Sequence, residues 1–230
     1  KAEAAKVLAD DQAAAKAAIQ QQLDTADANI TTIQSNIDAI EQLLKDNPGD
    51  ADIQAALDDA NAQLTAANKQ LAALATAMTA SQDATTPAAV QAARDSATAA
   101  ASEITDATTQ STTDLADAQK KADANLAAAK SAAETAIGDQ LTQVTDNIAQ
   151  INDDIKQLTQ IATDNPDNTK IAALLDDAKS QLATATTQQT AIKDAQAAID
   201  AATTVAAVTA FEDPATTATT TADTAQTTAD

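Results

Sequence analysis

The chain has 230 residues, a formal net charge of −21 and an isoelectric point near 4.1, with one phenylalanine and no tryptophan or tyrosine. Its acidic surface repels phosphate backbones and anionic lipid, and no apolar run approaches the roughly 18 residues of a spanning helix, so we expect no nucleic-acid partner and no membrane insertion. Cysteine and histidine are absent, which removes disulfides, the usual general base and the commonest metal ligand; we therefore expect no enzymatic activity, no cofactor and no catalytic, cofactor-binding or metal-binding residues.

The first predicted element is a helix that runs from near the start of the chain to about Lys45. Its apolar residues follow alternating steps of three and four, which places them on one face of a helix as a heptad seam. The seam residues are Ile19, Leu23, Ala26, Ile30, Ile33, Ile37, Ile40 and Leu44. Alanine dominates the apolar residues, and the chain has only two glycines and four prolines. The whole chain is therefore predicted to be all-α, with few and long helices.

A turn is predicted at residues 46–50, where the sequence Asp-Asn-Pro-Gly-Asp combines a preset φ with a residue that permits a tight reversal. Asp50 is the predicted N-cap of the second helix. That helix ends near Asp83 and carries a second seam with the same spacing. Its members are Ile53, Leu57, Ala60, Leu64, Ala67, Leu71, Leu74 and Met78.

A third helix follows, with Thr86 as the predicted N-cap and Pro87 as the first helical residue. Its seam is weaker and consists mostly of alanine. Between Pro87 and Asp164 only Gly138 interrupts good helical sequence. We therefore expect one continuous helix of about 76 residues, some 115 Å long at 1.5 Å per residue.

The pattern of the first half returns 118 residues later, since Asn47 in the first Asp-Asn-Pro turn matches Asn165 in the second. In the second copy, the counterpart of the first helix's seam keeps the same spacing while its side chains change in size. It reads Ile137, Leu141, Val144, Ile148, Ile151, Ile155, Leu158 and Ala162. Such an internal repeat predicts two tandem three-helix bundles, residues 1–118 and 119–230, joined by the continuous helix into an elongated rod.

The end of the second copy is less regular than that of the first. Asn168 or Thr169 is predicted to cap its second helix, and Thr204 its third. At Pro214 three alternatives stay open: the helix kinks there, a new helix starts there, or the tail beyond it frays. The Thr/Ala-rich tail after Pro214 is expected to be the least ordered part of the chain, since threonine is a poor helix former.

Oxygen-bearing side chains gather at the two turns, and such ligands suit Ca²⁺. They are Asp46, Asn47, Asp50 and Asp52 in the first copy, and Asp164, Asn165, Asp167 and Asn168 in the second. The spacing lacks the alternating acidic pattern and the bidentate glutamate of a calcium loop. The same residue types are also what a turn between helices needs. Turn chemistry is the preferred interpretation, with a calcium site as the alternative.

An acidic pair, Asp58 and Asp59, recurs as Asp176 and Asp177 on the solvent side of the second helix of each copy. We expect these carboxylates to be solvated or paired with nearby lysines, with contact to a partner as the alternative. No cleft is predicted around any carboxylate, and the two glycines are isolated. The sequence thus predicts neither an acid–base pair nor a phosphate-binding loop.

Residues 64–69 resemble the repeat of alanine-rich fish antifreeze helices, in which threonines recur every 11 residues. Thr65 and Thr76 have that interval, as do Thr98 and Thr109, but the next steps fail. In the second copy alanine and aspartate replace the first pair. Ice binding is therefore kept only as a minor alternative.

Three helices that share a connecting helix resemble the spectrin repeat and the three-helix modules in stalks of bacterial surface adhesins. The tryptophan typical of spectrin repeats is missing here. The resemblance implies a non-enzymatic stalk or spacer module of a large repetitive extracellular protein on a bacterial cell surface, which holds a functional tip away from that surface. Its partners would be neighbouring repeats of the same polypeptide. The alternatives are a helical binding module for a host protein or glycan, and an intracellular filament linker. The start at Lys1 without methionine leads us to expect a processed product or a piece of a longer chain.

Overall fold

The computed structural model describes residues 2–229, with side chains described for all of them except 212–216 and 225–229. Over these residues the chain is all-α, as predicted, with five helices and no strand. The helices are α1 (Ala2–Asp46), α2 (Ala51–Asp83), α3 (Pro87–Asp164), α4 (Thr169–Ala201) and α5 (Val205–Ala229). Within this part of the chain, no helix is both long enough and apolar enough to cross a membrane.

The helix starts in the first half are set by the predicted caps. Asp50 has an extended backbone, and its carboxylate accepts hydrogen bonds from the N–H groups of Asp52 and Ile53, each at 3.0 Å. The hydroxyl oxygen of Thr86 accepts from the N–H of Ala89 at 3.2 Å. Pro87 is the first residue of α3, as predicted. These contacts satisfy N–H groups that have no partner within the helix itself.

The second half uses the same signals. Asn168, not Thr169, caps α4 and accepts from the N–H groups of Lys170 and Ile171. Thr204 accepts from a backbone N–H of the first turn of α5 at 3.2 Å. The backbone of α5 is helical on both sides of Pro214, so the structure has no new helix start there. Whether the tail beyond it is less ordered stays a prediction.

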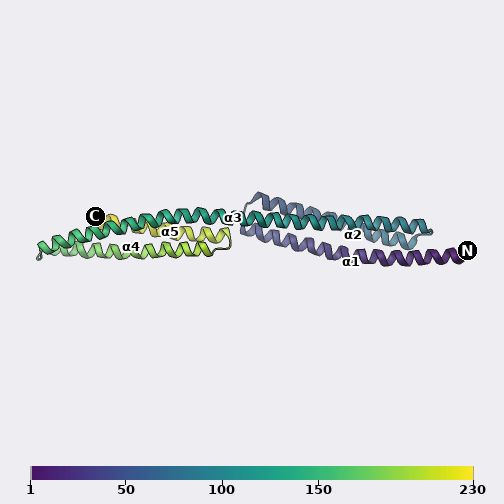
Figure 1. Ribbon diagram of the computed structural model, residues 1–230, viewed down its shortest axis with the longest axis horizontal. Helices are drawn as coiled ribbons and strands as arrows, with labels where there is room; N and C mark the ends of the chain where they lie inside the picture. The colour runs from purple at the N-terminus through teal and green to yellow at the C-terminus, as the bar shows by residue number, and fades with distance from the viewer. Residues whose placement is uncertain (1, 230) are drawn as a thin grey trace. The chain divides into compact units, whose positions relative to one another are not determined.

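The chain divides into two compact units, the first ending at Asp123 and the second beginning at Ala124. In the first unit, α1 and α2 lie alongside the N-terminal part of α3, and buried residues of all three form one apolar cluster (Figure 1). In the second unit, α4 and α5 lie alongside the C-terminal part of α3 around a second cluster (Figure 1). α3 therefore supplies core residues to both units.

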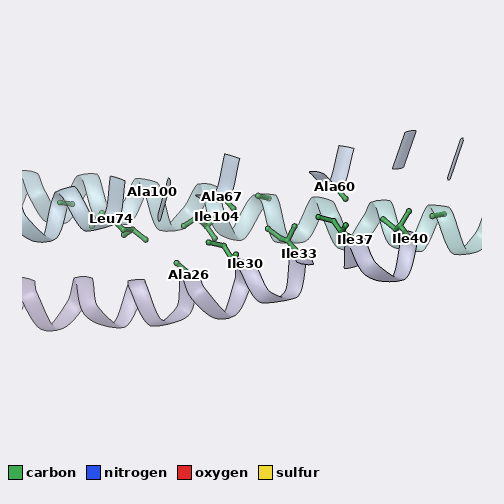
Figure 2. Packing of buried hydrophobic residues seen from close by; sticks show 14 of the residues in the cluster. Ala26, Ile30, Ile33, Ile37, Ile40, Ala60, Ala67, Leu74, Ala100 and Ile104 are labelled. Atoms are coloured by element: carbon green, nitrogen blue, oxygen red, sulfur yellow. The ribbon is translucent and has the colours of Figure 1, made fainter. Parts of the chain in front are cut away.

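The core of the first unit consists mainly of isoleucines and alanines together with Leu74, and most of these residues belong to the predicted seams (Figure 2). Its fully buried larger side chains are Ile19, Ile33, Ile40, Ile53, Leu74 and Ile104. Between them lie small members such as Ala26, Ala60, Ala67 and Ala100. Alternation of large and small side chains lets facing helices interdigitate with a short distance between their axes. This packing explains why alanine can dominate a core without aromatic residues.

The core of the second unit occupies matching positions but is less extensive. Its buried cluster comprises Ala133, Ile137, Val144, Ile151, Ala185, Ile192, Ala195, Ile199, Ala202, Val208, Ala218 and Ala222. In the first unit the buried cluster extends to Ile40 and Ile53, beside the turn between α1 and α2. In the second unit, Leu158 and Ile171 hold the matching positions beside the turn between α3 and α4, and both are only half-buried.

The helix ends recur at a fixed interval. The end of α1, both ends of α2 and the start of α3 each have a counterpart 118 residues later, in the end of α3, both ends of α4 and the start of α5. Caps and prolines at matching positions account for this recurrence, because each helix end is set by residues within a few positions of it.

Candidate functional site

The turn between α1 and α2 is a tight reversal with a partly buried interior. The N–H of Asp50 donates to the carbonyl of Asn47 at 3.2 Å. Gly49 has a φ of +82°, the left-handed value that a type II turn requires at its third residue, after a proline such as Pro48. The side chain of Asn47, a residue only 7% exposed, donates to the carbonyl of Leu43 at 2.9 Å. The turn therefore closes on its own backbone.

Lys121 of α3 ties the third helix of the first unit to this turn. Its ammonium nitrogen lies 2.8 Å from a carboxylate oxygen of Asp52 and 3.8 Å from one of Asp50. The pKa of Lys121 is raised above its ordinary value, first by the hydrogen bond to Asp52 and then by the negative charges of Asp52 and Asp50. The sequence analysis missed this cation because no local spacing links it to the turn.

A buried polar contact joins α1 and α3 further from the turn. Asn36 of α1 donates to the hydroxyl of Ser111 at 2.8 Å, and Ser111 is fully buried. Beyond Ser111, Leu115, Ala118 and Ala122 of α3 contribute to the apolar cluster of the first unit. The segment from Ser111 to Ala122 therefore covers the end of the α1–α2 hairpin.

The turn between α3 and α4 has a different backbone and a different environment. Asp167 takes the place of Gly49, and no described non-glycine residue has a positive φ, so this turn is compatible with type I. The N–H of Asn168 donates to the carbonyl of Asn165 at 3.1 Å. Asn165 is exposed, whereas its counterpart Asn47 is buried.

Apolar side chains near the second turn are more exposed than their counterparts. Ile161 is 45% exposed and Leu174 is 55% exposed, while the matching Leu43 and Ala56 are half-buried. α5 lies along the hairpin of α3 and α4 but ends before their turn (Figure 1). In the first unit, α3 continues past the corresponding point. Among the described residues of the second unit, no helix therefore covers this hairpin end, which we call the uncovered hairpin end.

The carboxylates proposed as calcium ligands have structural roles at the first turn. Asp46 accepts from the side chain of Gln42, Asp50 caps α2, and Asp52 pairs with Lys121. Within the described residues, acidic side chains nowhere gather in a group of three or more that could hold a metal ion. At the second turn, Asn168 has the capping role.

The recurring acidic pairs lie on exposed positions of α2 and α4. Asp58 accepts from Gln54 at 2.9 Å, within one turn of the same helix. Asp176 lies 3.9 Å from the ammonium group of Lys179 in an exposed ion pair. Both contacts lie within a single helix, and of the two only that of Asp176 is with a lysine.

The threonines at 11-residue intervals use their hydroxyl protons within their own helices. Each donates to the carbonyl four residues earlier, at 2.9–3.0 Å. The four residues are Thr65, Thr76, Thr98 and Thr109. This local bonding is a common arrangement for threonine inside helices. These four hydroxyl protons are therefore used inside the helices that carry them.

The C-terminal ends of α2 and α4 are held by counterpart side chains of different chemistry. Gln12 of α1 donates to the carbonyls of Gln82 and Ala84, each at 2.9 Å. In the second unit, Lys130 of α3 donates to the carbonyl of Asp200 at 2.7 Å. Terminal carbonyls of a helix lack partners within the helix and attract donors and cations. The contact recurs at the same register although the residue has changed.

A shallow groove of about 580 Å³ lies between the C-terminal part of α2 and the start of α3. It is lined by alanines, one threonine and one serine. In the second unit the aromatic residue Phe211 occupies the position of the groove residue Ala93 and packs partly buried against the core. The lining carries no charged group and so offers no acid, base or metal ligand.

No protein-family model, curated protein or solved structure matches this chain in the comparisons with known proteins.

Proposed function

We propose that the chain is a non-enzymatic structural spacer composed of two tandem three-helix bundles. The recurrence of four helix ends at an interval of 118 residues supports the proposal most directly. In this arrangement α3 serves as the third helix of one bundle and as the first helix of the next. Neighbouring repeats of the same polypeptide are then the principal partners.

The spacer acts by length and stiffness. A straight helix with the 78 residues of α3 extends about 117 Å at 1.5 Å per residue. A continuous helix holds the two bundles in line as a rod, which would carry a functional tip away from a bacterial cell surface. The net charge of −21 opposes collapse and self-association. We expect such a rod to be one part of a large extracellular, adhesin-type protein.

The hydrogen bonds that the polar side chains make also support this proposal. Asp50, Thr86 and Asn168 cap helices. Gln12 and Lys130 bind terminal carbonyls, so they hold one helix against the next. These contacts stabilise helix ends and helix pairs, which is what a spacer needs.

Small-angle X-ray scattering on the full chain tests the proposal. A compact globule of this length has a radius of gyration of about 17 Å and a disordered chain about 52 Å. A rod about 110 Å long gives about 32 Å. We expect about 32 Å together with high helicity by circular dichroism. A value near 17 Å would overturn the spacer.

A matched pair of proline variants sharpens this measurement. Ala124→Pro places proline in the interior of α3, where it breaks the helix, and should lower the radius of gyration. Ala88→Pro lies in the first turn of the same helix, where proline is tolerated, and should leave it unchanged. Equal values for the two variants would show that a continuous α3 does not set the length.

A further inference from the structure

The uncovered hairpin end of the second unit is an apolar surface at the end of α3 and the start of α4. We define it by the residues Leu158, Ile161, Ile171, Leu174 and Leu175. Ile161 and Leu174 are about half exposed, and the other three are half-buried. Large aliphatic side chains left this open around one turn mark a surface that can bind another apolar face.

The first unit shows what kind of element fits such a surface. There the matching hairpin end packs against α3 between Ser111 and Ala122, through the small or aliphatic residues Leu115, Ala118 and Ala122. Under this cover Ile53 is fully buried, whereas its counterpart Ile171 in the second unit is not. α5 is described as far as Ala229, the counterpart of Ser111, and no described helix continues over the second hairpin end.

Charge distinguishes the two surfaces. In the first unit, Asp50 and Asp52 face Lys121 of the covering helix. In the second unit Asn168 and Lys170 hold the two turn positions. A covering helix with a lysine in the register of Lys121 would therefore place two cations together, whereas a carboxylate there would form an ion pair with Lys170.

We propose that the uncovered hairpin end is the docking site for an amphipathic α-helix of a further repeat, which runs on in the direction of α5. The helix carries alanine or leucine in the register of Leu115, Ala118 and Ala122, and a carboxylate opposite Lys170. This inference rests on the tandem-repeat spacer proposed above. The charge exchange makes the second site select a different helix from the first.

The test appends the segment Thr113–Ala124 to Asp230 of the full chain, which places each residue in its proposed register. Two versions are compared, the natural segment and one with Lys121→Asp in the appended copy. Hydrogen exchange is measured by mass spectrometry over residues 155–175. With the acidic version we expect exchange to slow about tenfold relative to the unextended chain. The natural segment should protect about twofold to fivefold less.

Two further variants keep the proposal falsifiable. An appended segment with Leu115→Asp and Ala118→Asp should give no protection, because its apolar face is lost. Lys170→Asp in the chain should reverse the order of the two original versions. Equal protection by all segments would overturn the proposal. Protection of the unextended chain that increases with protein concentration would also overturn it, because a second copy of the chain would then occupy the site. The scattering of the unextended chain tests the spacer separately, so either idea can fail alone.

Discussion

The two hairpin ends share an Asp-Asn-Pro turn but differ in burial. Asn47 and Ile53 are both buried beside the first turn. Beside the second turn, Asn165 is exposed and Ile171 is half-buried. The helix bounds around both turns match residue for residue. Local signals therefore fix where helices end, and the presence of a covering helix decides how much of a seam is removed from water.

The largest expected effect comes from one substitution made in both units. Ile53→Ala removes a fully buried side chain, and at such sites the loss costs about 2–5 kcal/mol. Ile171→Ala alters the same residue at the same register where it is half-buried, so it should cost less than half as much. Urea unfolding gives the total, and hydrogen exchange reads each unit. Equal costs would contradict the difference in cover.

The next effect concerns the two caps. Loss of an N-cap side chain costs about 0.5–2 kcal/mol. Asp50→Ala should lie in the upper part of that range because Asp50 accepts two hydrogen bonds at 3.0 Å and also faces Lys121. Asn168→Ala should lie in the lower part, since its bonds are 3.2 and 3.4 Å long. Thermal unfolding of the two variants compares these losses of stability. A larger loss for Asn168→Ala than for Asp50→Ala would contradict the prediction.

The smallest effect is a pH dependence confined to the first turn. The pKa of Lys121 is raised in the folded chain by Asp52 and Asp50. Its contribution to stability is therefore complete below the unfolded value of about 10.4 and is lost as the pH rises through the folded pKa. The stability difference between the natural chain and Lys121→Gln should be constant from pH 7 to about pH 9 and should shrink above about pH 10.4.

Lys120→Gln is the matched control, because it removes an equal charge from the exposed neighbouring position. Its effect should not follow the same decline. If both variants lose their effect together as the pH rises, the net charge of the chain and not the ion pair is responsible.

Most of the helical pattern could be predicted, because helix ends depend on adjacent residues. Asp50, Thr86 and Pro87 act within three or four positions of themselves, so their roles are visible in the sequence. The partners across helices were not predicted. The pairing of Lys121 with Asp52, and of Asn36 with Ser111, depends on the register between helices that are far apart in the chain.

The exposure of the second hairpin end was not predicted either. The seam from Ile137 to Ala162 has the same spacing as the first seam, and spacing alone indicates burial at every position. Burial also needs a third helix over that position. The candidate calcium ligands illustrate the same limit, since the capping role of Asp50 was predicted but the cation facing it was not.

The alanine-based core has a thermodynamic consequence. The heat capacity change of unfolding grows with the apolar area exposed, and it averages about 3 kcal/mol/K for a chain of this length. Small methyl side chains at positions such as Ala26, Ala60 and Ala67 expose less of that area than aromatic or long aliphatic residues would. We therefore expect a smaller heat capacity change and a flatter stability curve. A protein with such a curve keeps a nearly constant folded population over a wide range of temperature, even when its maximum stability is modest.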